Sequence, residues 1–460
     1  MFTGQAFSIF KSQINGKIIQ PDNPDYDTAR KVYNGMIDKY PGLIVYCENE
    51  DDVKASVNFA RENGLLVAVR GGGHHGAGLG LCEEGVVIDL SAMKGIAIDP
   101  VDHTVTVGGG CTLAEMDQAT QAQGLIVPAG VISSTGIGGL TLGGGLGHLT
   151  RRYGLSIDNL LEARIVLADG SAVNASEDMN SDLFWAIRGG GGNFGIVISF
   201  VFRAHPLTTV LGGPMFWHIE DAKEVMQWYR EFVKSAPDTV TGFFVISGIP
   251  PNDHFPQPLQ LKNICAIIWC CTGDELTANH YLESARRVKE PVLDWVGEMP
   301  FIVLQKLFDA MTPPGLDWYW KGDYVNELTD EAIAKHIHHG KLLPTWQSAM
   351  HLYPVNGVAA RVDKNATAWN HRSATWAMVI AGVSSDTSQR SMITEWAKEY
   401  WNDLHPHSAG ASYINFMMDE REGAVKASYG DNYERLVSIK DKYDPHNFFR
   451  VNQNIPPSPR

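Results

Sequence analysis

Three clusters of glycine in the first 200 residues constrain this chain more than any other feature of its sequence. They lie at residues 71–80, 136–147 and 189–195, and are called here the first, second and third glycine loops. Because glycine has no Cβ, such loops let backbone N–H groups crowd around a bound anion. Three of them predict a large ligand with a diphosphate and a ring system, for which a dinucleotide is the natural candidate.

A Rossmann nicotinamide site is one alternative. Gly71, Gly73 and Gly76 follow a predicted strand with the spacing G-x-G-x-x-G, and Asp89 lies near the distance expected of the ribose-binding acid. However, no helix is predicted after Gly76, because the chain continues through GAGLGLCEEG into another strand. The third glycine loop likewise precedes the strand GIVISF. The helix N-terminus that binds the pyrophosphate is therefore missing, which argues against such a site.

Short helices and strands alternate through the first 200 residues. A helix is predicted at residues 51–63, a buried strand at 65–69 and a second helix at 112–123. Thr112 is the expected N-cap of the second helix and Glu115 its capping-box partner. This pattern predicts an α+β fold.

The glycine density falls near His205, where a second region begins. It combines a predicted helix within residues 221–235 with a long apolar strand at 263–271, which is typical of a sheet covered by helices. The tail contains one more predicted helix, NYERLVSIKDKY, followed by an extended segment.

Charge and hydropathy exclude several kinds of partner. The net charge is −15, from 37 Lys and Arg against 52 Asp and Glu, which opposes binding to nucleic acid. No run approaches the roughly 20 apolar residues of a membrane span. The first residues lack both the positively charged start and the continuous apolar stretch of a signal peptide. We therefore expect no membrane partner and a cytoplasmic location.

Cysteine and histidine patterns predict neither disulfides nor a metal site. No C-x-x-C pair occurs, and most cysteines lie in apolar, strand-like stretches that predict buried thiols. The cluster His336, His338 and His339 lacks carboxylates at ligand spacing, so it is interpreted as a solvated helix end.

Four motifs in order carry a resemblance to a known family. They are VRGGGHH, PAGVISSTGIGGLTLGGGLGHLTRRYGLSIDNL, LFWAIRGGGGNFGIV and KYDPHNFFRVNQNIPP. Together they resemble the berberine bridge enzyme-like branch of the vanillyl-alcohol oxidase flavoproteins, over most of residues 36–210 and the last thirty. The resemblance implies a two-domain α+β fold of the PCMH type that binds FAD.

The resemblance also implies a division of the chain. Residues 1–207 would form the FAD-binding domain, residues 208–412 an α/β substrate domain whose sheet covers the flavin, and residues 413–460 a segment that returns to the first domain. The expected cofactor-binding residues are Arg70, Gly71, Gly72, Gly73, His74, His75, Gly78, Leu79, Gly130, Thr135, Gly136, Gly138, Gly139, Gly143, Gly144, Gly147, Gly195, Val197, Asn452 and Asn454.

In this family, the histidine that ends the R-x-G-G-H run forms a covalent bond to the 8α-methyl group of the flavin, and that register selects His74. Many relatives make a second link through a cysteine in G-x-C-P-T-x-G-x-G-G. Here Ile132 stands at the cysteine position. The resemblance thus implies a single covalent link through His74, with His75 beside it in the cofactor loop.

The family chemistry implies that a small organic substrate gives a hydride to FAD and that dioxygen then accepts the electrons, releasing hydrogen peroxide. Thr135 and Leu140 match the positions near the reactive edge of the ring. Relatives with a Y-x-N-Y segment use its last tyrosine as base, but this chain has Phe416 there, which cannot accept a proton. Tyr413 and Asn415 of the same segment remain candidate catalytic residues.

Other substrate-side candidates have no assigned role: His351, Arg361, His371, Arg372, Tyr319, Trp320 and Lys321. Two alternatives to an oxidase stay open. One is an FAD-dependent dehydrogenase with an acceptor other than oxygen. The other is a flavin-binding protein without turnover, which Phe416 at the base position suggests.

Overall fold

Two small sheets form the glycine-rich half of the protein, which a computed structural model describes for residues 4–418, 420 and 422–459. The first has the strand order β1-β2-β4-β3, with β2 and β3 both parallel to β4. Its strands are β1 (Lys17–Ile19), β2 (Leu43–Tyr46), β3 (Val67–Arg70) and β4 (Val86–Asp89). Helix α3 (Glu50–Glu62) packs against this sheet, and the Asn49 side chain caps it by accepting from the Asp52 N–H.

The second sheet is antiparallel, with the order β5-β6-β10-β8-β9. Its strands are β5 (Ile96–Asp99), β6 (Thr104–Gly108), β8 (Leu160–Val166), β9 (Ala172–Ser176) and β10 (Ile196–Arg203). Helix α4 (Leu113–Gln121) begins at the predicted capping box, because the Thr112 N–H donates to Glu115 over 2.8 Å and the Glu115 N–H donates to Thr112 over 3.4 Å.

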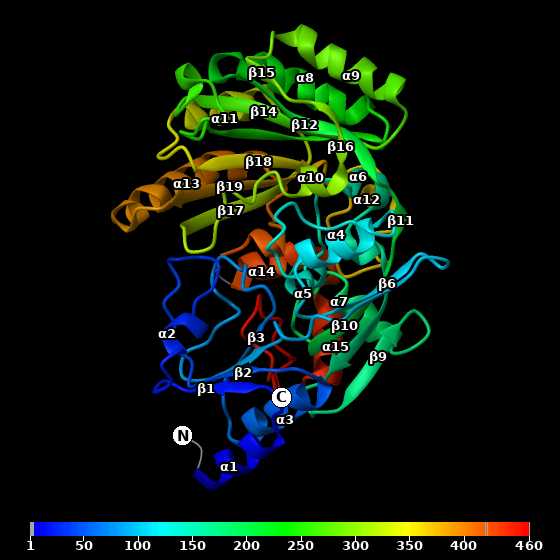
Figure 1. Ribbon diagram of the computed structural model, residues 1–460, viewed down its shortest axis with the longest axis vertical. Helices are drawn as coiled ribbons and strands as arrows, with labels where there is room; N and C mark the ends of the chain where they lie inside the picture. The colour runs from blue at the N-terminus through cyan, green and yellow to red at the C-terminus, as the bar shows by residue number, and fades with distance from the viewer. Residues whose placement is uncertain (1–3, 419, 421, 460) are drawn as a thin grey trace.

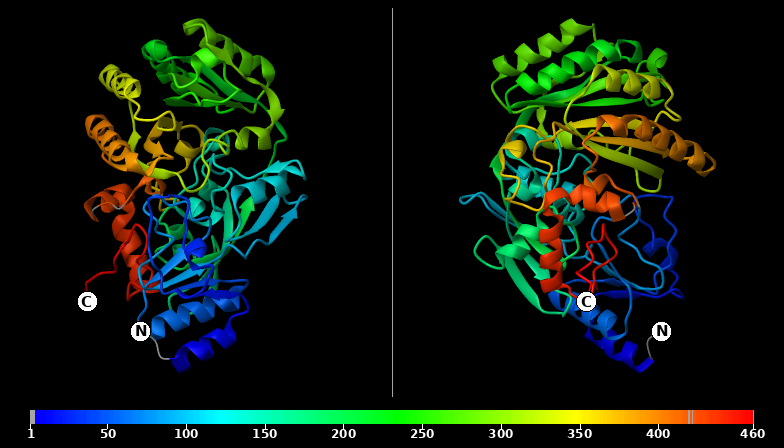
Figure 2. Two further views of the ribbon diagram at one scale, coloured as in Figure 1. Left: turned by 60° about the vertical axis from the view of Figure 1, so that its left-hand side comes forward. Right: turned by 180° about the vertical axis from the view of Figure 1, so that it is seen from behind.

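An eight-stranded antiparallel sheet forms the other half (Figure 1). Its order is β15-β12-β14-β13-β18-β19-β17, and β16 also pairs with β12. The strands are β12 (Thr209–His218), β13 (Val240–Gly248), β14 (Asn263–Cys271), β15 (Leu293–Asp294), β16 (Gly297–Pro300), β17 (Asp317–Val325), β18 (Ala349–Pro354) and β19 (Trp376–Ser384). Four helices cover one face: α8 (Ala222–Ser235), α9 (Glu275–Val288), α11 (Asp330–Lys341) and α13 (Arg390–Leu404) (Figure 2).

Both faces of this sheet are apolar, which explains the uninterrupted hydrophobic run of β14. Trp217, Phe244 and Trp269 pack under the helices, whereas Phe243 and Val245 belong to a core shared with the glycine-rich half. The sheet therefore lies between its own helices and the glycine loops.

The end of the chain returns to the glycine-rich half (Figure 1). Helices α14 (Glu422–Tyr429) and α15 (Tyr433–Tyr443) contribute to the core that contains α7 (Ser181–Ile187). The remaining short elements are α1 (Gly4–Gln13), α2 (Tyr26–Ala29), α5 (Ile137–Leu142), α6 (Thr150–Tyr153), α10 (Phe301–Gln305), α12 (Val358–Arg361), β7 (Leu125–Ile126) and β11 (His205–Pro206).

The helices and strands predicted above by residue range are confirmed to within two residues at each end, whereas the strand predicted at GIVISF continues to Arg203 as β10. All six cysteines are free and buried, as predicted. The interpretation of the histidine cluster as a solvated helix end is wrong. His336 and His339 lie on the buried face of α11, where they pair with Tyr400 and Asp403 of α13 over 2.8 Å each.

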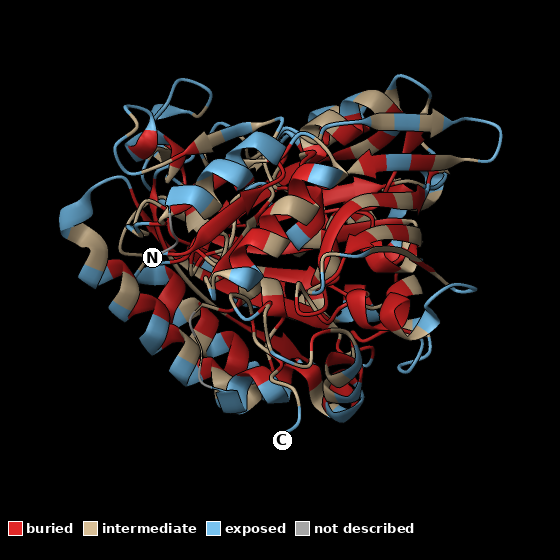
Figure 3. Ribbon diagram, turned by 90° about the horizontal axis from the view of Figure 1, so that it is seen from below, coloured by how far each residue is buried: buried red, intermediate tan, exposed pale blue. Residues whose placement is uncertain are grey.

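Buried residues fill the central strands, whereas exposed residues lie on the outer faces of the helices, in peripheral strands and in peripheral loops (Figure 3). Within the described part of the chain, no helix is both long enough and apolar enough to cross a bilayer.

Candidate active site

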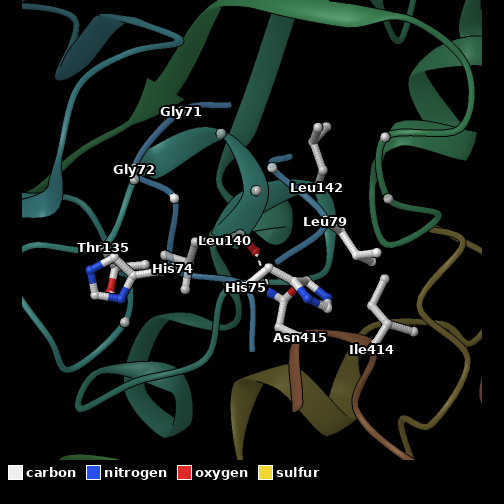
Figure 4. A pocket seen from close by; sticks show the side chains of 18 of the residues that line it. Gly71, Gly72, His74, His75, Leu79, Thr135, Leu140, Leu142, Ile414 and Asn415 are labelled. Carbon is white, nitrogen blue, oxygen red and sulfur yellow. Dashed lines mark hydrogen bonds between the residues drawn. The ribbon is translucent and has the colours of Figure 1, made fainter. Parts of the chain in front are cut away.

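A cavity of about 390 Å³ lies between the glycine-rich half and the eight-stranded sheet. All three glycine loops contribute to its wall, together with one face of β17, β18 and β19 and the segment after α15. Figure 4 shows the part of the wall that the first two glycine loops and Asn415 form. One cavity therefore joins parts of the chain from Tyr33 to Gln453.

Glycine shapes this cavity in two ways. Gly72 and Gly136 approach so closely that a Cβ on either would collide with the backbone of the other, which brings the first two glycine loops together. Gly139 and Gly192 line the cavity, yet no heavy atom lies within 4 Å of where their Cβ would be. Side chains at these two positions would occupy the space that a ligand needs.

His74 lies in the wall where the first two glycine loops meet. Its Nε2 is 2.9 Å from Ser134 Oγ. Its Nδ1 is 3.5 Å from Oγ1 of Thr135, which lies beside it in Figure 4. Tyr33 stacks on the imidazole, with ring centroids 3.9 Å apart. Burial lowers the pKa of His74 to about 4, which outweighs the hydrogen bond at Ser134. The ring is therefore neutral and held in one orientation.

His75 also lines the cavity. Its Nδ1 accepts from the Ala77 N–H over 3.2 Å, and burial, with a smaller effect of Lys39, lowers its pKa to about 4. The Nδ1 lone pair of His75 is therefore engaged by its own loop.

Most of the residues expected from the sequence come together in this cavity. The wall includes Arg70, Gly71, Gly72, Gly73, His74, His75, Leu79, Gly130, Thr135, Gly136, Gly138, Gly139, Leu140, Gly195, Val197, Tyr413, Asn415 and Asn452. Arg70 is fixed beside the wall by an ion pair with Asp89 and by donation to the Ala29 carbonyl over 2.7 Å.

The other expected residues lie behind the wall. Gly78 is in a turn at φ +63°, and Gly147 donates its N–H to Thr150 Oγ1 over 2.8 Å. Gly143 lies against the Asn415 side chain, and Gly144, at φ +136°, lies against Tyr413. These glycines allow close packing of the loops rather than forming the cavity surface.

Asn452 and Asn454 follow α15. Asn452 donates from Nδ2 to the Gly192 carbonyl over 3.1 Å, which joins the tail to the third glycine loop. The Oδ1 atoms of Asn452 and Asn454 are buried and have no partner among the described residues. Asn454 itself is outside the cavity wall.

Tyr413 and Asn415 form a fixed pair. The Tyr413 hydroxyl accepts from the Gly145 N–H and from Asn415 Nδ2, both over 2.8 Å. Asn415 Nδ2 also donates to the Leu140 carbonyl over 3.0 Å, as Figure 4 shows. Burial raises the pKa of Tyr413 to about 12. This arrangement holds the second glycine loop in place and leaves Tyr413 a poor base.

Sequence reasoning missed Tyr353, which lines the cavity from β18. Its hydroxyl oxygen lies 2.6 Å from Nδ1 of His351, and both residues face the cavity with Ala349. Alternation along the strand was the available signal, since residues 349, 351 and 353 share a face. Which face meets the cavity depends on how the two halves pack.

Most of the other substrate-side candidates lie elsewhere. Trp320 and His351 line the cavity. Arg372 forms a buried ion pair with Asp158, Arg361 pairs with Asp238 on the surface, and Lys321 pairs with Glu420. Tyr319 packs against the core under the helices, and the His371 ring is 3.0 Å from the Ser428 carbonyl.

The sheet side of the cavity is aromatic and uncharged. Phe308, Trp318, Trp320, Tyr353 and Phe416 contribute to it. Among the described residues, the whole wall contains no Asp, Glu or Lys, and its one Arg is already paired. No group of three or more metal-ligating side chains occurs in the described part of the chain.

The glycine-lined cavity and the α+β fold are those of a dinucleotide-binding enzyme. Residues 41–176 match the model of an FAD binding domain, and residues 412–456 match a berberine and berberine-like model. The chain is 31% identical to an FAD-linked oxidoreductase of Dictyostelium discoideum over 98% of this chain and 97% of the relative.

The fold is also that of solved structures, among them two oxidases. The crystal structure of 6-hydroxy-D-nicotine oxidase from Arthrobacter nicotinovorans superposes with a TM-score of 0.87 at 25% identity, covering 97% of this chain and 98% of that one. Glucooligosaccharide oxidase from Acremonium strictum superposes with a TM-score of 0.87 at 20% identity, covering 98% of this chain and 100% of that one.

The chain belongs to the berberine bridge enzyme-like family of FAD-linked oxidoreductases. The predicted family, the α+β fold and the assignment as an FAD-dependent oxidoreductase are thereby confirmed. The cavity fits this cofactor, because Gly139 and Gly192 leave open the space that side chains would take.

Proposed function

We propose that this protein is an oxidase that holds FAD through one covalent bond to His74, oxidises an uncharged organic substrate, and passes the electrons to dioxygen with release of hydrogen peroxide. The position of His74 carries the proposal. Its neutral imidazole lies in the cavity wall between Tyr33 and Ser134, at the junction of two glycine loops.

Covalent attachment requires a ring nitrogen with a free lone pair. In the tautomer that donates from Nε2 to Ser134 Oγ, the lone pair is on Nδ1, which meets Thr135 Oγ1 at the long distance of 3.5 Å. Burial keeps the ring unprotonated at neutral pH. The glucooligosaccharide oxidase of Acremonium strictum carries a 6-S-cysteinyl, 8α-N1-histidyl FAD. Here Ile132 lines the cavity and no cysteine does among the described residues, which supports a single link.

The bound FAD supplies a two-electron acceptor. The chain's own contribution is to position the cofactor through the glycine loops and to orient a substrate against the aromatic face of β17 and β18. An unpaired charge is costly in an apolar cavity. Because the wall offers no free charged partner, we expect an uncharged substrate with a planar apolar body.

Thr135 and Leu140 both line the cavity, and Thr135 contacts His74. The family resemblance places both residues near the reactive edge of the flavin, where oxygen would approach. The second candidate function is a dehydrogenase that passes electrons to a quinone or dye. It would apply if the side chains of Thr135 and Leu140 keep oxygen away from the flavin.

One experiment separates these functions. The purified holoprotein is mixed anaerobically with a panel of uncharged aromatic alcohols and with their carboxylate and ammonium analogues. The flavin absorbance is followed before and after air is admitted. We expect an uncharged member to bleach the flavin, and air to restore the colour within seconds and produce peroxide.

Slow recovery in air with fast recovery by a quinone would identify a dehydrogenase. Failure of every member to bleach a flavin that dithionite reduces would contradict the proposed enzyme activity.

A further inference from the structure

A histidine and a tyrosine on β18 form a pair that the family resemblance does not assign. Ala349, His351 and Tyr353 alternate along the strand, so all three face the cavity. His351 Nδ1 and Tyr353 Oη are 2.6 Å apart, a short hydrogen bond between side chains of the same strand. Ala349 beside them leaves room for a planar ligand.

The pair occupies a place where a base is needed. Phe416 stands where relatives have a catalytic tyrosine, and the Tyr353 ring packs beside it with centroids 5.9 Å apart. The Tyr353 hydroxyl therefore lies near the position where relatives have the tyrosine hydroxyl that Phe416 lacks. It comes from β18 instead of from the segment that contains Phe416. Tyr413 does not replace it, because its oxygen already accepts two hydrogen bonds.

The surroundings of the pair are uncharged. Phe243, Phe308 and Phe416 pack around it, and the strand partners of His351 are Val245 on β13 and Val379 on β19. Three further titratable groups lie nearby among the described residues. His148 and Cys270 line a small hollow together with Tyr353, and Tyr413 packs against Phe416. Burial raises the pKa of both Cys270 and Tyr413, so neither adds a charge.

Burial alone lowers the pKa of His351 to about 4, and burial alone raises the pKa of Tyr353. Both side chains are thus neutral before reaction. In the tautomer with Nδ1 unprotonated, Tyr353 donates its hydroxyl proton to His351, which can accept it.

We infer that Tyr353 and His351 form the proton-accepting pair for substrate oxidation, with Tyr353 contacting the substrate hydroxyl and His351 retaining the proton. The inference rests on the proposed function, in which FAD is the oxidant.

Atoms and electrons balance in this step. The substrate C–H bond breaks, and its hydrogen leaves with both electrons to FAD. The substrate O–H bond breaks, its proton goes to Tyr353 Oη, and the Tyr353 proton goes to His351 Nδ1. The carbon and oxygen are left joined by a double bond. The substrate loses two electrons and FAD gains them.

Charge explains why a weakly basic histidine suffices. Two-electron reduction with one proton adds a negative charge to a cavity that has no free charged side chain among the described residues. Protonated His351 supplies the compensating positive charge, and the attraction between the two raises the histidine pKa when the cofactor is reduced. Proton uptake by His351 and reduction should therefore be coupled.

This coupling can be measured without substrate. For a two-electron couple, each proton taken up shifts the midpoint potential by about 30 mV per pH unit. We expect the wild-type holoprotein, titrated reductively between pH 6.5 and 8, to give a slope steeper than the roughly 30 mV per pH unit of FAD alone and no steeper than about 60 mV, the excess coming from proton uptake by His351. The His351→Gln variant should give about 30 mV per pH unit.

The chain offers a matched control. His336 Nδ1 is 2.8 Å from Tyr400 Oη, burial lowers the pKa of His336 to about 3, and this pair lies away from the cavity on the helix-covered side of the sheet. His336→Gln should keep the wild-type slope. Tyr353→Phe retains His351 and should also keep it, but its flavin should be reduced by substrate about 100-fold more slowly.

Equal slopes in wild type and His351→Gln would overturn the inference, as would an unchanged rate of reduction in Tyr353→Phe. If the Gln side chain prevents FAD loading, His351→Asn is used with the same expectations. Absence of FAD from the wild type would instead contradict the proposed function, so the two failures are distinguishable.

Discussion

At single histidines, burial decides protonation. Desolvation is the main reason that three buried histidines, His74, His148 and His351, each have a pKa of about 4. His74 also has a hydrogen-bond partner, whereas neither ring nitrogen of His148 has one among the described residues. His148 therefore offers the clearest test of this effect.

His148 should make the protein sensitive to acid. Its pKa falls from 6.5 in the unfolded chain to about 4 in the folded protein, so the unfolded chain binds the proton more tightly. The stabilisation is complete above pH 6.5 and is lost as the pH falls from 6.5 through 4. Between pH 7.5 and 5 the free energy of unfolding should drop by about 2 kcal/mol on account of this residue.

Urea unfolding of the His148→Phe variant at both pH values measures this contribution, because Phe cannot titrate. The difference between the two pH values should shrink by about 2 kcal/mol relative to wild type. His446→Phe, at an exposed histidine, is the control. It should leave the difference in unfolding free energy between the two pH values almost unchanged. An undiminished acid effect in His148→Phe would show that His148 does not carry it.

The residues of the glycine loops could be predicted from the sequence, because glycine spacing and the R-x-G-G-H run are local patterns. Tyr353 could not, because nothing local says which face of β18 meets the cavity. The error at His336 has the same origin. Its partner Tyr400 lies 64 positions away on another helix, so the pairing that buries the histidine is invisible in the spacing of the cluster.

Among the elements, α15 shows how the tail supports the cofactor site. Lys440 on this helix is fully buried and donates to the Asn193 carbonyl over 2.7 Å, to Asp444 over 2.6 Å and to the Phe449 carbonyl over 3.0 Å. All three of its donors are used. One ammonium group thus joins α15, the third glycine loop and the segment that leads to Asn452.

Removing this group should be costly. Lys440→Met leaves Asp444 buried without its cation, for which we expect a loss of about 3–5 kcal/mol in unfolding free energy and weaker retention of FAD before attachment. Lys442→Met is the matched control two positions away. Its ion pair with Asp182 is largely exposed, so the loss should stay below about 1 kcal/mol.

Chemical denaturation of both variants, with the flavin content of each preparation, tests this difference. Similar stabilities for the two would mean that the buried ion pair does not hold the tail in place. The helix itself was predictable from its apolar periodicity, but the role of Lys440 was not, because its acceptors come from three separate segments.

At the level of the whole molecule, the cavity exists because two halves with different architectures meet. The glycine loops supply a surface with few side chains, and the eight-stranded sheet supplies an aromatic face. The α+β class and the change of composition near His205 were visible in the sequence. The close approach of Gly72 to Gly136 and of the tail to the third glycine loop required the assembled fold.

Covalent attachment at His74 is the central proposal, and acid precipitation tests it most directly. Wild type, His74→Ala and His75→Ala are purified with FAD, precipitated with acid and pelleted, and the flavin absorbance of pellet and supernatant is compared. His75 is the matched neighbour, because it lines the same cavity but its Nδ1 accepts from the Ala77 N–H. We predict flavin in the pellet for wild type and His75→Ala, and in the supernatant for His74→Ala. Flavin retained in the pellet of His74→Ala, or released from wild type, would contradict the assignment.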